Sequence, residues 1–254
     1  MKQGFLVFVS FVLMVLFCVP VFGQPSNRSV ETIGIDNFDT AGEMGWTWSY
    51  QASRFVTEGF PKLGYFDGMP SSLTYLRKEG DPEAKVLGAK VSFDRKGDNW
   101  IEIFPTTTGD NGEAKNYEIP LIGNVSQIDF WVWGANYLYF LEVLVRDADG
   151  RVHVIPACTT NFEGWKNIIV NIPSSIRQHS RLRSGPETLS FVGFRVRSDG
   201  NEYVDDFVIY FDNLKYTTNV LRNIYDGYEL RDADFGSDET TQTEQAAATP
   251  AEAK

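Results

Sequence analysis

The chain has 254 residues and an acidic charge balance, with 34 aspartate and glutamate residues against 23 lysine and arginine residues and a net charge of −11. This balance argues against a nucleic-acid-binding protein, because binding to phosphates needs a basic patch or stripe. The sequence has only two cysteines, Cys18 and Cys158. If Cys18 leaves with a signal peptide, no disulfide within the chain is possible, and an apolar core must hold the fold together.

The N-terminus has the features of a secretory signal peptide, which we expect to cover Met1–Gly23. Lys2 supplies the positive charge at the start, and Phe5–Val19 is the apolar run. Cleavage is expected between Gly23 and Gln24. The apolar run is short for a membrane span, so we expect an exported protein that no membrane holds after cleavage.

The rest of the chain divides into a folded part and a tail. Asp232–Lys254 is acidic, and after Phe235 it has no aromatic or branched aliphatic residue. Such a segment cannot bury enough apolar surface to repay its ordering entropy, so we expect a disordered tail. Residues 24–231 are expected to form a single β-sandwich domain.

Short segments with period-two alternation recur along this domain, separated by turn-forming residues. The expected strands include 32–39, 85–94, 99–104, 117–121, 165–172, 188–197 and 203–216. Arg95–Asp98 is interpreted as a hairpin turn, Gly42–Ser53 as a strand or an aromatic loop, and Phe55–Lys78 as a long irregular excursion. Many short strands and almost no helix predict an all-β fold, an antiparallel two-sheet sandwich with the jelly-roll form of carbohydrate-binding modules.

The stretch Ser126–Pro156 is the most informative part of the domain. Its three extended runs are separated by Gly134–Asn136 and Asp147–Gly150, both rich in residues that form tight turns, so we expect a meander of three strands. Both faces of these strands are apolar. We expect one face to form a layer of the core; it carries Ile128, Phe130, Val132, Leu138, Phe140 and Leu144.

The opposite face of this stretch is aromatic and needs a cover, either the Gly42–Lys78 region or another protein subunit. Alternation alone cannot decide which face is inside, because a shift of one residue exchanges the two. A second aromatic group, in the Gly42–Ser53 segment, either stacks on sugar rings or fills a core or an interface. The candidate interaction residues are Trp131, Trp133, Tyr137, Tyr139, Trp46 and Trp48.

The sequence offers little for catalysis or metal binding. The only histidines are His153 and His179, and no nucleophile-elbow or phosphate-loop pattern occurs. Cys158 is expected to be a buried apolar residue rather than a nucleophile. Three acids near strand ends, Asp36, Asp39 and Asp212, could hold a structural Ca²⁺ or simply cap the strands by hydrogen bonding. We therefore predict no enzyme, no catalytic residues, no metal ligands and no cofactor.

Four long blocks of the sequence resemble the flagellar filament outer-layer (sheath) proteins of the periplasmic flagella of spirochaetes. The blocks are Val86–Pro105, Ile128–His153, Phe162–Gln178 and Phe207–Thr218, within a resemblance that runs from about Ile33 to Thr218. The family has no catalytic motif that could be transferred to this chain.

The resemblance implies a structural, non-enzymatic role in the periplasm. Proteins of this family coat a filament core built of flagellins and are thought to affect filament stiffness, shape and motility. The implied partners are core flagellins and other copies of the protein itself or related sheath proteins. Two alternatives remain: a secreted carbohydrate-binding module, suggested by the aromatic Gly42–Lys78 region, and a glycoside hydrolase, for which no acid pair is evident.

Overall fold

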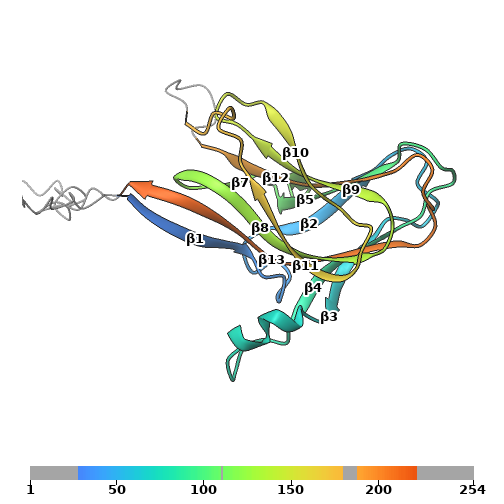
Figure 1. The fold of residues 1–254 in the computed structure, drawn as a ribbon, viewed down its shortest axis with the longest axis horizontal. Helices are drawn as coiled ribbons and strands as arrows, with labels where there is room; N and C mark the ends of the chain where they lie inside the picture. The colour runs from blue at the N-terminus through green and yellow to red at the C-terminus, as the bar shows by residue number, and fades with distance from the viewer. Residues whose placement is uncertain (1–27, 110, 180–187, 222–254) are drawn as a thin grey trace, which may run out of the picture. The chain divides into compact units, whose positions relative to one another are not determined.

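A computed structural model of the chain describes residues 28–109, 111–179 and 188–221. The expected signal peptide Met1–Gly23, its cleavage site at Gly23 and Gln24, and the expected tail Asp232–Lys254 all lie outside the described residues. The described residues form two antiparallel sheets and one short helical turn (Figure 1). The predicted all-β, two-sheet antiparallel sandwich is therefore confirmed. No helix in these ranges is long and apolar enough to cross a membrane.

Two layers of strands make up the sandwich, and we call them sheet A and sheet B. Sheet A has the spatial order β11 (Glu163–Asn171), β8 (Asn124–Ala135), β13 (Phe207–Leu221), β4 (Lys85–Val91) and β3 (Lys62–Asp67), with β1 (Arg28–Asp36) also paired to β13. Sheet B has the order β10 (Val152–Thr159), β9 (Tyr139–Arg146), β12 (Ser190–Ser198), β5 (Trp100–Thr108) and β2 (Thr47–Ala52), with β6 (Ala114–Asn116) on β5 and β7 (Ile119–Pro120) on β12.

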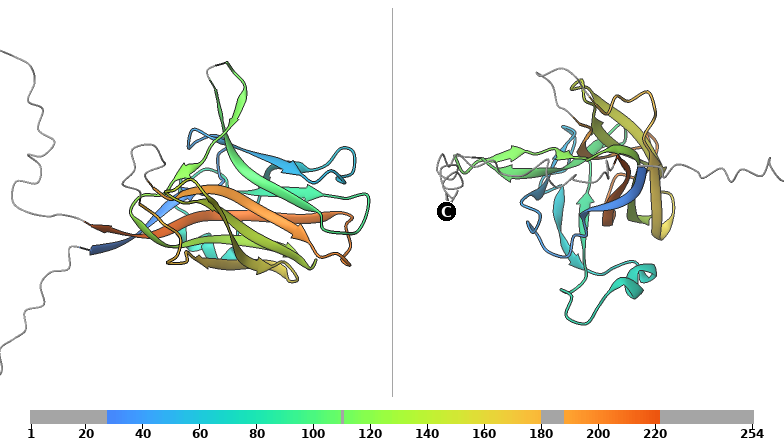
Figure 2. Two further views of the ribbon diagram at one scale, coloured as in Figure 1. Left: turned by 90° about the horizontal axis from the view of Figure 1, so that it is seen from above. Right: turned by 90° about the vertical axis from the view of Figure 1, so that its left-hand side faces the viewer.

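Along one of its edges, the long strand β13 pairs with two different strands in succession. Its first half pairs with β4, from Phe207 opposite Val91 to Phe211 opposite Leu87. Its second half pairs with β1, so β1 takes over the place beside β13 where β4 ends. Figure 2 shows β1 in dark blue beside the red end of β13.

The core lies between the sheets and is built from the inward residues of alternating strands. Phe194 of β12 joins the layers: its ring stacks on Phe211 of β13 with centroids 4.5 Å apart and meets Phe130 of β8 edge-on at 4.9 Å. All three side chains are fully buried. Each aromatic ring of this kind removes a large apolar area from water, so this cluster contributes much of the stability of the sandwich.

Several connections that looked like hairpins instead cross from one sheet to the other. The predicted hairpin at Arg95–Asp98 is wrong, because β4 belongs to sheet A and the next strand, β5, belongs to sheet B. Turn-forming residues reverse the chain, but they do not decide whether the next strand pairs with the previous one or faces it across the core. Such crossings are typical of the predicted jelly roll.

The predicted three-stranded meander is half right. The strands β9 and β10 do pair, and their turn at Asp147–Gly150 closes with a hydrogen bond from Gly150 N to Asp147 O of 3.0 Å. The turn at Gly134–Asn136 instead carries the chain from β8 in sheet A to β9 in sheet B. Asn136 has the expected positive φ of 62°, but its N–H donates to Phe162 O at 2.8 Å, which ties the turn to the start of β11 rather than to β9.

This crossing also decides the faces of the two strands. The face assigned to the core in β8 is correct, since Ile128, Phe130 and Val132 are fully buried. In β9 the assignment is wrong for most residues, because Tyr139 and its alternating partners face the core and Phe140 is partly exposed, although Leu144 is buried as expected. The inner faces of sheet A and sheet B pack against each other across the core. The alternation along β8 therefore does not continue in the same phase into β9.

The predicted irregular excursion Phe55–Lys78 contains regular structure. It includes β3, which pairs with β4 from Lys62 opposite Lys90 to Asp67 opposite Lys85. Residues 68–84 connect these two strands and contain the 3₁₀ helix η1 (Ser71–Leu76). This connection, here called the arm, projects from sheet A (Figures 1 and 2).

Candidate interaction surface

A row of residues on the outer face of sheet A runs across five of its six strands. The register places Trp165 of β11 opposite Trp133 of β8, which lies opposite Tyr210 of β13. Tyr210 in turn lies opposite Gly88 of β4, and Gly88 opposite Gly64 of β3. Three aromatic rings are thus followed by two residues without side chains.

The two glycines leave space that neighbouring rings fill. A Cβ atom on Gly88 would lie 2.6 Å from the Tyr210 ring and 2.7 Å from the Phe66 ring, which is closer than atoms can pack. The Tyr210 ring meets Phe66 edge-on at 5.8 Å and Trp133 edge-on at 5.5 Å. Gly88 is therefore needed for the close approach of these rings.

The rings and the base of the arm enclose a shallow groove of about 220 Å³, here called the aromatic groove. Its lining consists of Phe66, Asp67, Gly68, Met69, Val86, Trp133, Trp165 and Tyr210. Among these lining residues, Phe66 is 51% exposed, whereas Val86 is buried. A concave surface that combines aromatic rings with a few polar groups can receive a ligand or a side chain of another protein.

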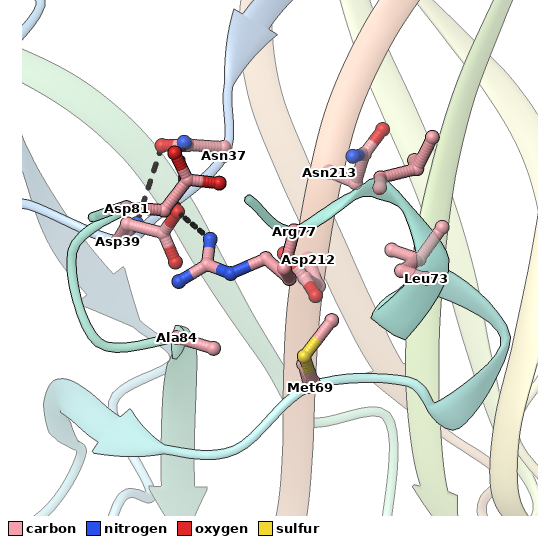
Figure 3. Close-up of a pocket in the computed structure, with 10 residues that line it drawn as sticks. Asn37, Asp39, Met69, Leu73, Arg77, Asp81, Ala84, Asp212 and Asn213 are labelled. Carbon is pink, nitrogen blue, oxygen red and sulfur yellow. Dashed lines mark hydrogen bonds and ion pairs between the residues drawn. The ribbon is translucent and has the colours of Figure 1, made fainter. Parts of the chain in front are cut away.

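The arm closes one side of this surface and is fixed by an ion pair (Figure 3). Arg77 Nη1 lies 2.5 Å from Asp39 Oδ2, and the Asp39 side chain is only 6% exposed. Asp39 also accepts hydrogen bonds from Asn37 Nδ2 at 2.9 Å and from the backbone N–H of Lys85 at 3.1 Å. The Arg77 guanidinium donates a further bond to the carbonyl of Pro82, within the arm.

A second acid lies in the same place, beneath the arm. Asp212 of β13 lines a cavity of about 200 Å³ together with Met69, Leu73 and Arg77 (Figure 3). The pKa of Asp212 is raised to about 7, chiefly by burial and also by the charges of Asp39 and Asp36, against the backbone hydrogen bond from Asn213 and the charge of Arg77. The arm therefore covers an acid whose charged form is costly in this position.

The proposed calcium alternative finds no support among these acids. Within the described residues, no group of three or more histidine, cysteine or acidic side chains is arranged to hold a metal ion. Asp39 binds Arg77, and Asp36 accepts hydrogen bonds from Trp48 Nε1 at 2.8 Å and Phe38 N at 2.7 Å. Burial raises the pKa of Asp36 in spite of these two bonds.

The six candidate interaction residues lie in different environments. Trp131 and Trp133 are partly exposed on the outer face of sheet A, and Trp133 lines the aromatic groove. Tyr139, which was expected beside them, is 1% exposed and stacks on Phe207 with centroids 4.1 Å apart. Tyr137 packs edge-on against Phe207 and donates its hydroxyl to Asp205 O at 3.0 Å. Tyr139 is thus a core residue and Tyr137 a packing residue.

The two candidates in the Gly42–Ser53 segment also have packing roles. Trp48 is 8% exposed and contacts the core rings, and Trp46 stacks on Tyr117 with centroids 5.6 Å apart. Trp48 is buried and offers no open ring face to a sugar, whereas Trp46 is partly exposed with one face covered by Tyr117.

Sequence reasoning missed three members of the groove. Trp165, Tyr210 and Phe66 lie on separate strands, and only the register of five strands brings them together. Alternation could have assigned each to an outward face, but not to one row.

The outer face of sheet B differs in kind, because its charges neutralise each other. Arg195 lies 2.5 Å from Glu102, and Arg197 lies 3.5 Å from Glu142. Although Glu102 and Glu142 share a face, each is bound by an arginine. This face therefore combines ion pairs within the subunit with exposed apolar side chains at its edge, Val152 and Val154 of β10.

Cys158 behaves as a packing residue rather than a reactive one. It is partly buried, and burial raises the pKa of its thiol to about 11. A thiol with a raised pKa holds little thiolate near neutral pH and is a poor nucleophile.

Comparison with solved structures returns carbohydrate-binding modules at low sequence identity. The chain is 14% identical to a family 11 carbohydrate-binding module of the cellulosomal cellulase Lic26A-Cel5E of Clostridium thermocellum, with a TM-score of 0.41 over 78% of this chain and 99% of that one. It is also 14% identical to the module TmCBM61, solved with β-1,4-galactotriose, with a TM-score of 0.38 over 74% of this chain and 99% of that one.

Comparison of sequences is more specific. A flagellar filament outer layer-like protein of Brachyspira hyodysenteriae is 31% identical over 192 residues, which cover 75% of this chain and 80% of that protein. The flagellar filament outer layer protein of Treponema pallidum is 30% identical over 115 residues, which cover 41% of this chain but only 33% of that protein. The model of the family described as flagellar filament outer layer protein FlaA matches residues 29–224. This chain therefore belongs to the family of flagellar filament outer layer proteins.

Proposed function

We propose that the protein is a structural, non-enzymatic component of the outer layer of the periplasmic flagellar filament. In this proposal it is exported by its N-terminal signal peptide, coats the flagellin core and contributes to the stiffness and shape of the filament, and hence to motility. Family membership supports the location. The single structural observation that supports a coating role is the open aromatic groove on sheet A.

The argument for a contact surface rests on what the fold itself needs. The inner face of sheet A already supplies a full core layer through residues such as Phe130 and Phe211. The rings of Trp133, Trp165 and Tyr210 on the outer face add nothing to that core. A lone subunit would be more soluble with polar residues there, so their apolar surface is best explained by a protein that covers it.

Of the candidate residues, Trp131 and Trp133 remain as proposed contact residues, and Trp165 joins them. The other four pack within the subunit, as described above. A subunit of an outer layer has to touch both the filament core and its neighbours. We propose that the outer face of sheet A makes one of these contacts.

The test is a comparison of filaments from cells that produce the wild-type protein, none, or a variant. Loss of the protein should reduce the diameter of isolated periplasmic flagella, and Trp133→Ala should reduce the amount of protein bound to them. Tyr203→Ala, which removes a ring that is 70% exposed away from the groove, is the matched control. A protein that purifies away from the flagella, with unchanged filament diameter after its deletion, would refute the proposal.

A carbohydrate-binding role is the second candidate, and one observation favours it. The indole N–H groups of Trp133 and Trp165 make no hydrogen bond with another described residue, so they could bind sugar hydroxyls while the rings stack on the sugar. Retardation of the protein in a polysaccharide gel, lost in Trp133→Ala and kept in Trp48→Phe, would support this role. Free migration in gels of several polysaccharides would count against it.

A further inference from the structure

The cavity beneath the arm, here called the arm cavity, combines acidic and aliphatic side chains. It has a volume of about 200 Å³ and lies between the arm and β13. Asp212 lies between Arg77 and Met69 in this cavity (Figure 3). The aliphatic part of the lining consists of Met69, Leu73, Leu76 and Ala84. The cavity therefore places a carboxylate beside an apolar wall.

The Asp212 carboxylate has no cation of its own. Asp212 is 5% exposed, and its carboxylate accepts a hydrogen bond from the N–H of Asn213. Arg77 lines the same cavity but is bound to Asp39 Oδ2 at 2.5 Å and to the carbonyl of Pro82. In the part of the chain that the structure describes, no lysine or arginine forms an ion pair with Asp212. A buried carboxylate is stable when it is paired or protonated, so Asp212 can take a cationic partner.

The charges around the arm cavity are acidic even when every cation of the arm is counted. The cavity lining contains three acids and one base, which are Asp39, Asp81, Asp212 and Arg77. The arm as a whole carries the bases Arg77 and Lys78 and the acids Glu79, Asp81 and Glu83. The local balance therefore has the same sign as the net charge of −11 of the chain. Both favour a cationic occupant.

The chemistry of the lining favours an ammonium group on an aliphatic chain over a metal ion. Calcium takes roughly six to eight oxygen ligands, and within the described ranges no three acids, histidines or cysteines are arranged to hold a metal. A lysine ammonium is a compact charge on a flexible stem, and this stem packs readily along apolar surface. Met69 and Leu73 offer such a surface beside the Asp212 carboxylate.

We propose that the arm cavity binds the side chain of a lysine from another protein of the filament. The ammonium group pairs with the Asp212 carboxylate, and the stem packs against Met69 and Leu73. The inference rests on the proposed function for the source of the lysine, because a protein of an outer layer has to contact its neighbours on the filament. The chemical class of the ligand, a primary ammonium on an aliphatic chain, follows from the cavity itself.

The first test measures binding of n-butylammonium, which reproduces the end of a lysine side chain, to the purified exported protein by isothermal titration calorimetry. The wild type should bind this probe saturably, and should not bind 1-butanol, which has the same chain without the charge. Asp212→Asn should weaken binding by about tenfold or more. Asp206→Asn is the matched control and should bind like the wild type, because the Asp206 side chain is 69% exposed outside the cavity. The melting temperature checks that both variants fold.

The pH dependence of binding gives a second readout. The ammonium group pairs with the charged form of Asp212, whose pKa is raised to about 7, chiefly by burial. The affinity for butylammonium should therefore rise by about tenfold per pH unit below pH 7 and level off above it. The other charged groups that face Asp212 are Asp39, Arg77, Asp36 and Asp81. All of them remain in Asp212→Asn, so its residual binding should not follow this curve.

Three results would overturn the inference. The first is a wild type that does not bind butylammonium or binds 1-butanol equally well. The second is an Asp212→Asn variant with the affinity and pH dependence of the wild type. The third is saturable binding of Ca²⁺ that requires Asp212 and occurs without any binding of butylammonium, which would assign the acids to a metal.

Binding to flagella isolated from cells that lack the protein separates this inference from the proposed function. Acetylation of the lysines of these flagella should weaken binding of the wild type more than binding of Asp212→Asn. If Asp212→Asn coats flagella as densely as the wild type, and acetylation affects both equally, the lysine contact is refuted while the coating role stands. If the wild type binds butylammonium but not flagella, the coating role fails and a filament protein is refuted as the source of the lysine.

Discussion

Replacing Asp212 by asparagine should stabilise the protein at neutral and alkaline pH and have little effect in acid. Asp212 is 5% exposed, and burial raises its pKa from 3.8 to about 7. Asparagine has nearly the same shape, keeps an oxygen that can accept the hydrogen bond from Asn213 N, and carries no charge. The groups that face Asp212 are Asp39, Arg77 and Asp36, and the substitution leaves all of them in place.

The sign follows from proton linkage. The folded protein holds the Asp212 proton more tightly than the unfolded chain does, so this group's contribution to stability is fully present below pH 3.8 and is lost as pH rises towards 7. A difference of about three pKa units corresponds to about 4 kcal/mol at most, since each unit is worth about 1.4 kcal/mol. The advantage of the asparagine variant should therefore grow between pH 4 and 7 and then level off.

Urea unfolding of both proteins at several pH values across this range measures the difference. Subtracting the two stability curves removes the pH dependence of every other acid. Asp206→Asn is a matched control. Asp206 directly precedes β13, the strand that carries Asp212, but its side chain is 69% exposed. A difference in stability that is constant with pH, or one that shrinks as pH rises, would show that burial does not disfavour the charged form of Asp212.

Four further substitutions test the packing. Tyr139→Ala should cost about 3–5 kcal/mol in urea unfolding because it empties a core site, whereas Trp131→Ala should cost much less and impair binding to flagella instead; equal losses of stability would contradict these placements. Gly134→Ala should cost about 1–3 kcal/mol, because its Cβ would lie 2.7 Å from a backbone carbonyl oxygen; an unchanged melting temperature would refute the close approach. Arg77→Ala leaves the buried Asp39 without its cation and should cost about 2 kcal/mol, with faster proteolysis of the arm; a protease-resistant arm would show that other contacts hold it.

The local signal of alternation predicts most of the strands, but not β3, which lies in the segment expected to be irregular. Alternation along β8, β11 and β12 places each strand within a few residues of its observed bounds. The fold class follows from the number of such strands and the lack of helix. These features depend on neighbouring residues only, and each strand repeats the pattern several times.

The pairing of strands was not predictable in the same way. The segments at Arg95–Asp98 and Gly134–Asn136 have the residues of tight turns, yet both connect strands in different sheets. A turn residue fixes the backbone at one position, whereas pairing depends on which strand buries its face against which. Tyr139 shows the result: its outward assignment assumed a hairpin with β8, and the crossing placed it in the core.

The groove shows a second limit of sequence reasoning. Each of Trp133, Trp165 and Tyr210 stands on an alternating strand, but Gly88 gives no sign in the sequence that it makes room for two rings. Only the register of β4 against β13 and β3 puts that glycine beside the rings. A site that spans five strands has a signal distributed over about 150 residues, from Gly64 to Tyr210, and no local pattern contains it.

The contrast between the two outer faces gives the direction of the proposed assembly. On sheet B the outward charges are bound to each other, as Arg195 is to Glu102, so this face is already satisfied within one subunit. On sheet A the outward rings meet one another only edge-on and leave a groove, and the arm that could have covered it projects away. Sheet B also exposes apolar side chains, Val152 and Val154 of its edge strand β10, so sheet A is distinguished by the grouping of its rings around a groove. We therefore expect substitutions on sheet A to release the protein from flagella, and substitutions of exposed residues on sheet B to leave it bound.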